Sequence, residues 1–178
     1  MRIISRLPDS RIESTNLMVE VSVEDYLSLV QNSLNNNEYQ RRRMRSSNTV
    51  YSLLKRDFLD GCVLPPIVLA LRGDAGTIEL TDENILPELA RRTSQLVILD
   101  GLQRTYSLLD LASETTDAAK RTAFLSQILR VEIYVGINRL GTLYRMLTLN
   151  TGQSPMSLRQ QIEMLYLDLA DTTIEGVS

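Results

Sequence analysis

The sequence predicts an α+β fold, a mixed α/β domain in which a small mixed sheet of roughly three to five strands is flanked by helices. Short apolar runs bounded by turn residues, such as residues 96–99, are typical of strands. Between them lie longer segments whose apolar residues recur every three or four positions, as in helices. The chain has 178 residues, of which 43% are hydrophobic and 23% charged, so we expect one domain with a substantial core.

The N-terminal part of the chain predicts strands and helices in alternation. Residues 1–16 are polar and rich in turn-forming residues, and we expect them to form an N-terminal arm that docks late or stays loose. Residues 17–21 predict a short strand, and Ser22 then supplies an N-cap for a helix with one apolar face. A second helix is expected over residues 48–59, where Gly61 is placed to end it.

The strands expected in the core come next. Pro65 and Pro66 favour extended backbone before residues 67–71, whose unbroken apolar run predicts a strand buried on both faces. The strand at 96–99 leads into a helix over about 103–112. The remaining expected elements are a return strand at 77–80, a helix near 116–129, an alternating strand at 130–135, a helix over 138–148 and a C-terminal helix within 151–178, capped by Ser157. The domain itself is expected to span residues 17–150.

The composition excludes several kinds of chemistry. The chain has no histidine, which removes Ser-His-Asp and Cys-His catalysis and histidine metal clusters. Cys62 is its single cysteine, so an intrachain disulfide and a cysteine-based zinc site are both impossible. Chemistry in this chain must therefore use carboxylates, amides, arginine or hydroxyls.

The basic residues are unusual in kind. The net charge is −3, so the surface as a whole does not attract polyanions. Lysine and arginine together number 19, yet only Lys55 and Lys120 are lysines, so 17 are arginines. Arginine suits bidentate contacts with phosphate and carboxylate, although a biased genomic base composition explains the excess equally well.

We expect a cytoplasmic protein without a membrane partner. No apolar run reaches the roughly 20 residues that a membrane-spanning helix needs. The N-terminal stretch MRIISRLPDSR lacks the apolar segment of a signal peptide.

The stretch DGLQRT, residues 100–105, is the strongest candidate site. A helix that begins after a strand presents unpaired backbone N–H groups and a positive dipole end, which together favour an anion. Gly101 allows a close backbone approach, and Arg104 is placed to grip a phosphate through two hydrogen bonds. Gln103 is suited to orient a water or to hold a ribose or base edge. Asp100 is suited to hold a metal ion, to fix Arg104 or to cap the helix. The plain alternative is a capped strand-to-helix turn without a ligand.

Three motifs in a fixed order give the chain a family resemblance. They are PPIV at residues 65–68, DGLQR at 100–104 and LNTG at 149–152. This order resembles the ParB/sulfiredoxin-like superfamily, and more closely its branch with DGQQR or DGQHR motifs. That branch includes the N-terminal domains of GmrSD-type modification-dependent restriction systems and the DndB-type regulators of phosphorothioate DNA modification. The resemblance implies the ParB/sulfiredoxin-like fold.

The resemblance also implies a function and a set of site residues. It implies nucleoside triphosphate (NTP) binding, with Mg²⁺-dependent hydrolysis as its extension, in a DNA-directed defence, modification or regulatory protein. Leu102 stands where the family has a glutamine, which leaves hydrolysis open. The implied catalytic residues are Asp100, Gln103 and Arg104, with Asp100 also as the metal ligand, and the implied nucleotide- and phosphate-binding residues are Gly101, Arg104, Thr105, Arg43, Arg45 and Asn150.

The implied partners are a nucleotide and, beyond it, DNA, a second copy of the chain or an effector domain. The alternative that the residues leave open is a DNA-binding or protein-interaction module without catalytic turnover. In that case the corner at residues 100–104 grips a DNA phosphate or serves only the fold.

Overall fold

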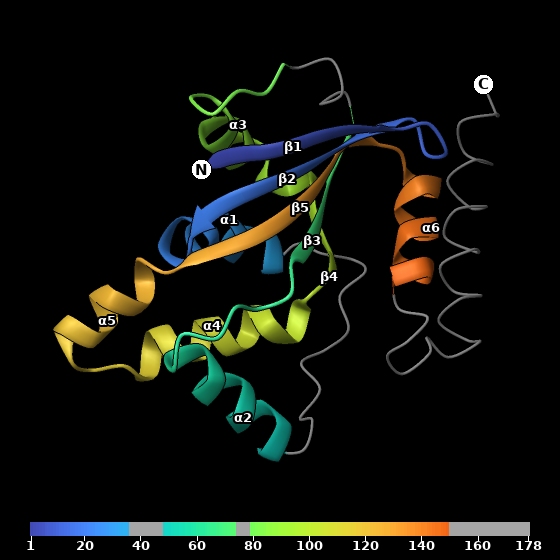
Figure 1. Ribbon diagram of the computed structural model, residues 1–178. Helices are drawn as coiled ribbons and strands as arrows, with labels where there is room; N and C mark the ends of the chain where they lie inside the picture. Colours follow the sequence, from blue (N-terminus) through green and yellow to red (C-terminus); the bar gives the residue numbers. More distant parts are fainter. Residues whose placement is uncertain (36–47, 74–78, 150–178) are drawn as a thin grey trace.

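The computed structural model describes residues 1–35, 48–73 and 79–149 of the chain. In these residues it contains a five-stranded sheet in the order β1-β2-β5-β3-β4, which confirms the expected small mixed sheet with flanking helices (Figure 1). The strands are β1 (Arg2–Asp9), β2 (Ser14–Ser22), β3 (Ile67–Arg72), β4 (Leu96–Asp100) and β5 (Ile128–Ile137). The helices are α1 (Val23–Asn35), α2 (Asn48–Leu59), α3 (Ile85–Arg91), α4 (Leu102–Glu114), α5 (Ala118–Leu125) and α6 (Arg139–Leu149), with a short 3₁₀ helix, η2 (Thr93–Gln95).

The sheet is mixed because one pair of neighbouring strands is parallel. β3 runs parallel to β5, whereas β1 with β2, β2 with β5 and β3 with β4 are antiparallel. The start of β3, the start of β5 and the end of β4 therefore lie at the same end of the sheet, where Val68 pairs with Asp100 and Ile67 with Val131. This end of the sheet carries the candidate site.

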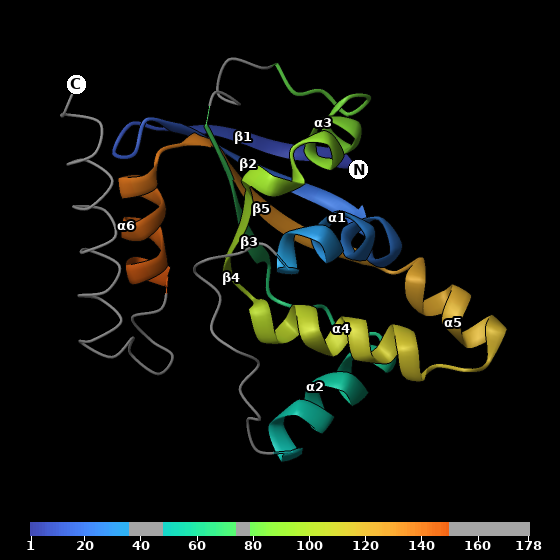
Figure 2. The same ribbon diagram turned by 180° about the vertical axis from the view of Figure 1, so that it is seen from behind.

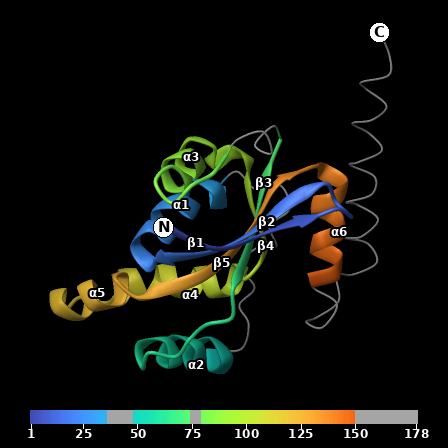
Figure 3. The same cartoon turned by 45° about the horizontal axis from the view of Figure 1, so that its top comes forward.

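Helices cover both faces of the sheet. Side chains of α1, α3, α4 and α5 pack with one face in the larger core, which buries alternate residues of the strands. Of the described helices, α6 packs on the opposite face, where Met146 joins a smaller cluster with Val68, Ala70 and Leu99. Figure 2 and Figure 3 show α6 separated by the sheet from α1 and α4. β3 and β4 are thus covered on both faces, as their unbroken apolar runs predict.

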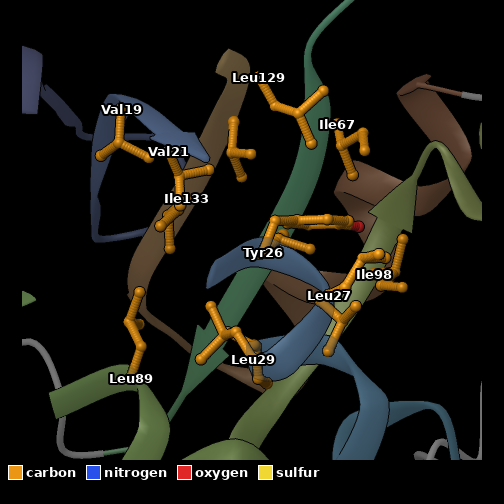
Figure 4. Packing of buried hydrophobic residues seen from close by; sticks show 14 of the residues in the cluster. Val19, Val21, Tyr26, Leu27, Leu29, Ile67, Leu89, Ile98, Leu129 and Ile133 are labelled. Atoms are coloured by element: carbon orange, nitrogen blue, oxygen red, sulfur yellow. The ribbon is translucent and has the colours of Figure 1, made fainter. Parts of the chain in front are cut away.

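The larger core centres on residues with essentially no exposed surface. Leu69, in the middle of β3, pairs with Ile98 on one side and Ile133 on the other. Tyr26 of α1 lies among these side chains with its hydroxyl end directed towards β4 (Figure 4). Phe58 of α2 reaches the same core and meets Phe124 edge to face, with ring centroids 5.5 Å apart. That aromatic contact joins the otherwise peripheral α2 to the rest of the domain.

The N-terminal arm expected at residues 1–16 does not stay loose, because its residues contribute β1 and the start of β2. β1 pairs with β2 along almost its whole length, and the amide of Ile3 donates to Asp82 Oδ1 at 2.7 Å. Ile12, in the turn after β1, is buried against Gly141 of α6. The apolar pattern does not reveal this strand, because backbone pairing holds it and several of its side chains remain exposed.

Arg145 fixes α6 against the first hairpin. Its guanidinium pairs with the Asp9 carboxylate and lies 4.9 Å from the centre of the Tyr134 ring. Burial raises the pKa of the nearby Glu132 carboxyl, and the positive charge of Arg145 partly opposes that rise. These contacts are internal, so we treat the cluster as structural.

Most other expected elements are confirmed, with differences at their ends. Residues 48–59 form a helix as expected, and Gly61 follows it with a left-handed φ of 82°. The helix expected near 116–129 is shorter, because residues 128 and 129 belong to β5. In the expected return strand at 77–80, residues 79 and 80 are not in a strand, and the rest lies outside the described residues. The cap at Ser157 also lies outside them.

No helix in the described parts of the chain is both long and apolar enough to span a membrane.

We predict that Leu69→Ala destabilises the fold by about 2–5 kcal/mol, because it leaves a cavity at the centre of the sheet. Urea unfolding followed by circular dichroism measures this change. Leu140→Ala on α6 is the control, since that side chain is 62% exposed, and its effect is expected to be within about 0.5 kcal/mol. Equal effects of the two substitutions would contradict the described core.

Candidate functional site

The corner between β4 and α4 is shaped by Gly101. This residue has φ = 92° and stands at the N-cap position of α4. A Cβ atom placed on it would lie 3.1 Å from both Cγ atoms of Ile67, the first residue of β3. Glycine is therefore required here both by the left-handed turn and by close packing on β3. We had expected its small size to serve a ligand, and the structure gives it a role in the fold.

Arg104 joins three segments at this corner. Its Nη1 donates to the carbonyl oxygens of Pro65 at 2.6 Å and Pro66 at 2.7 Å. Its Nη2 forms an ion pair with Asp100 Oδ2 at 2.5 Å. The guanidinium is 13% exposed and the carboxylate 22% exposed, so solvent weakens this pair only in part. Arg104 thus holds the end of β4, the first turn of α4 and the segment before β3 together.

These bonds limit what Arg104 can offer to a ligand. A guanidinium carries five N–H donors, and those described here use three of them. The Asp100 carboxylate also balances the positive charge. An incoming phosphate would have to compete with a negative group that is already in place. Of the three roles expected for Asp100, fixing Arg104 is the one that the geometry shows.

The first turn of α4 has no side-chain cap. Gly101 has no side chain to offer, and the Asp100 carboxylate is directed to Arg104 instead. By contrast, Ser22 Oγ accepts from the amide of Asp25 in α1, and Asp117 Oδ1 accepts from the amide of Lys120 in α5. The simple capped-turn interpretation is therefore wrong for α4. Its dipole end stays available to an anion or to water.

Thr105 does not belong to a phosphate site. It is fully buried, its hydroxyl donates to the carbonyl oxygen of Gly101 at 3.0 Å, and the Tyr26 hydroxyl lies 2.7 Å from it. The assignment of Thr105 to ligand binding is thus wrong, because the side chain points into the core and not out of the first turn. Burial raises the pKa of the Tyr26 phenol well above its usual range, a rise that the Thr105 hydrogen bond and the Arg104 charge partly oppose.

Tyr26 is the residue at this corner that the sequence did not single out. Its place on the apolar face of the first helix fits an ordinary core residue. The available signal was the hydroxyl itself, since a buried tyrosine needs a hydrogen-bond partner. The pattern does not say that this partner lies 79 residues away on α4.

Gln103 carries an acceptor without a described partner. Its side-chain Oε1 is buried and makes no hydrogen bond within the described part of the chain. A buried amide oxygen that lacks a donor is unfavourable, so this atom favours a water or a ligand N–H or O–H nearby. The neighbouring Leu102 packs against the larger core. That packing explains why an apolar residue is suitable at this position of the motif.

The remaining predicted residues lie elsewhere in the chain. Arg43, Arg45 and Asn150 fall outside the described residues, so the structure does not relate them to the corner. Their assignments stay predictions.

A magnesium ion finds a poor donor set at this corner. Asp100 is its only carboxylate among the described residues of the DGLQRT stretch, and one oxygen of that carboxylate already binds Arg104. No cluster of three or more acidic or cysteine side chains suited to a metal occurs in residues 1–35, 48–73 and 79–149. Mg²⁺ usually combines one or two carboxylates with substrate phosphates. We therefore derive no step through a protein-held metal.

A pocket adjoins the segment that Arg104 holds. It has a volume of about 190 Å³ and lies where β3 and β5 begin. Its lining residues are Glu20, Val63, Leu64, Pro65, Ile67, Ile128, Leu129 and Arg130. Pro65 and Ile67 are shared between the pocket and the corner, so a shift of either residue changes both.

Comparisons with known proteins do not extend this description. No protein-family model, no curated protein and no solved structure matches the chain. The resemblance to the ParB/sulfiredoxin-like superfamily therefore stays a prediction carried by its three motifs.

We predict that Thr105→Val destabilises the fold by about 1–3 kcal/mol, because it leaves the Tyr26 hydroxyl unpaired in the core. Tyr26→Phe removes that hydroxyl, so adding it to Thr105→Val is expected to recover part of the loss. A double-mutant cycle of urea unfolding measures the coupling. Strictly additive effects would show that the two hydroxyls do not interact.

The raised pKa of Tyr26 predicts a loss of stability in alkali. Below about pH 10 the phenol is protonated in both the folded and the unfolded chain. Above it the unfolded chain releases this proton while the folded chain retains it, so unfolding becomes more favourable by up to about 1.4 kcal/mol per pH unit. Urea unfolding from pH 9 to 11 should show a steeper decline for the wild type than for Tyr26→Phe. Parallel declines would contradict the burial of the phenol.

Proposed function

We propose that the corner formed by Asp100, Gly101, Gln103 and Arg104 binds the phosphates of a nucleoside triphosphate. The observation that carries the proposal is the uncapped N-terminus of α4 beside Arg104. Backbone N–H groups at such a terminus bind anions, and an arginine one turn into the helix adds charge-assisted donors. Gln103 supports the proposal because its buried Oε1 suits a donor from a ribose, a base or an attacking water.

The pairing of Asp100 with Arg104 gives the site a defined mode of action. The carboxylate holds the guanidinium at the corner, so the side chain is already confined there before a ligand arrives. It also reduces the net charge of the empty site. Affinity then depends on short contacts with the helix amides and the guanidinium N–H groups, and less on long-range attraction. Mg²⁺ enters the proposal as the counter-ion that a triphosphate brings with it.

The wider role that we propose follows from the resemblance of the three motifs. A nucleotide switch of this kind would serve a DNA-directed defence, modification or regulatory protein in the cytoplasm. DNA, a second copy of the chain or an effector domain are its proposed partners. Binding is the core of the proposal, and slow hydrolysis, with Gln103 orienting a water, is its extension.

A second function is favoured by the internal bonds of Arg104. Three of its donors serve the chain itself, as expected of a residue that stabilises a turn. On this reading the domain is a DNA-binding or protein-interaction module without turnover. The corner would then contact one DNA phosphate through the α4 N-terminus or serve only the fold.

Isothermal titration distinguishes these functions. We expect one of ATP, GTP and CTP, each with Mg²⁺, to bind the wild type with a Kd of roughly micromolar order. We expect Arg104→Ala to weaken that binding at least about tenfold, since it removes charge-assisted bonds to the phosphates. Arg91→Ala is the matched control, because that side chain is 73% exposed and pairs with Glu88 away from the corner.

Circular dichroism confirms that each variant is folded before it is titrated. Absence of heat with all three nucleotides would overturn the nucleotide proposal. A loss of DNA affinity in Arg104→Ala, with a shallower dependence on salt, would then favour the DNA-binding module.

A further inference from the structure

The connection between α2 and β3 is held by few contacts of its own. Gly61 turns the chain with a positive φ, and the amide of Cys62 donates to the carbonyl oxygen of Asp57 at 2.9 Å. Beyond this point Val63 is 75% exposed, and the two prolines that follow have no N–H group to donate. Arg104 supplies the hydrogen bonds that anchor the proline carbonyls. Leu64 packs against the larger core, and Arg104 of α4 is the described side chain that holds the two prolines after it.

The helix before this connection is peripheral. Figure 1 and Figure 2 show α2 on the outer side of α4, away from the sheet. Lys55 binds the carboxylate of Glu114 at 2.6 Å, and Phe58 enters the core. Leu53 and Leu59, however, are each 52% exposed. The described packing of α2 is thus limited, and residues 60–66 are its covalent link to the sheet.

A phosphate on Arg104 would compete with these anchors. Nη1 of Arg104 gives its two hydrogens to the proline carbonyls, and Nη2 gives one hydrogen to Asp100. A phosphate gripped through the edge formed by Nη1 and Nη2 needs one hydrogen from each nitrogen, so this grip displaces at least one proline carbonyl. A phosphate carries negative charge and the proline carbonyls do not, so the guanidinium is attracted more strongly to the phosphate. A bound phosphate also repels the Asp100 carboxylate. The guanidinium is therefore expected to turn towards the ligand and to give up one or both proline carbonyls.

We infer that Arg104 is a latch between the ligand corner and α2. In the free protein it holds the carbonyls of Pro65 and Pro66; when a triphosphate binds, it releases them, and residues 60–66 gain freedom together with α2. This inference rests on the proposed function and names the regulation of that same site. The pocket beside Pro65 would change shape in the same step. Ligand binding at the corner would therefore alter a surface formed by β2, β5 and the segment that leads into β3.

The chain contains a natural reporter for this motion. Cys62 is its single cysteine, is exposed and lies within the connection, so a nitroxide spin label attached to it reports the mobility of residues 60–66. Electron paramagnetic resonance spectra would be recorded without ligand and with ATP, GTP and CTP, each with Mg²⁺. The expected result is a mobile fraction that rises roughly twofold or more with the nucleotide that binds.

Arg104→Lys tests, in the absence of ligand, whether the guanidinium holds residues 60–66 in place. Lysine keeps the charge but lacks the planar fork that reaches two carbonyls and a carboxylate together. Its label is expected to be mobile before any nucleotide is added and to respond little afterwards. Arg91→Ala, the matched control, should behave as the wild type. The wild-type comparison needs no variant and remains decisive where a substitution prevents folding.

The outcomes separate the latch from the proposed function. Heat of binding in titration with an unchanged label spectrum would overturn the latch and leave nucleotide binding in place. No heat with any nucleotide would overturn both the proposed function and the ligand-driven release. An immobile label in folded Arg104→Lys without ligand would show that Arg104 does not hold residues 60–66 in place, and would overturn the latch.

Discussion

The interactions of one guanidinium set the geometry of the candidate site. Arg104 bonds to two carbonyls before β3 and to the carboxylate that ends β4. β3 and β4 are also neighbours in the sheet, so these bonds join the start of β3, the end of β4 and the first turn of α4 at one end of it. Gly101 allows these segments to meet, because only a residue without Cβ can turn so close to Ile67. A change at any of these residues is expected to move the others.

Behind this corner the hydroxyl groups of Tyr26 and Thr105 form a buried series of hydrogen bonds. The Tyr26 and Thr105 hydroxyls lie 2.7 Å apart, and Thr105 passes a hydrogen bond to the carbonyl oxygen of Gly101. A buried polar chain is favourable only when its members are satisfied, so it fixes how α1 meets α4. The turn is thereby supported from the core as well as from Arg104. The first turn of α4 is thus hydrogen-bonded to the core on its inner side, while it lacks a side-chain cap at its N-terminus.

The sequence predicted the elements that local patterns determine. The unbroken apolar runs of β3 and β4 and the apolar periodicity of α1 and α2 are visible without the fold. β1 was missed because strand pairing, not its own apolar pattern, orders it. At the site, the pattern located residues 100–104 correctly as a strand-to-helix corner, but it could not tell which side chains face inward. Thr105 is buried and Leu102 packs against the core, and two of the three partners of Arg104 are prolines nearly 40 residues earlier in the chain.

The same bonds that stabilise the corner make Arg104 suitable as a switch. A phosphate-binding arginine that is free in solution loses side-chain entropy on binding and transmits nothing to the fold. An arginine already bonded to the chain exchanges one set of acceptors for another, so the ligand must bind strongly enough to replace them. The free energy of that exchange is what would couple the ligand to the α2–β3 connection, because a ligand shifts a conformation only by its differential affinity for the two states. The free energy needed to release the proline carbonyls would therefore both lower the affinity for the ligand and couple ligand binding to the α2–β3 connection.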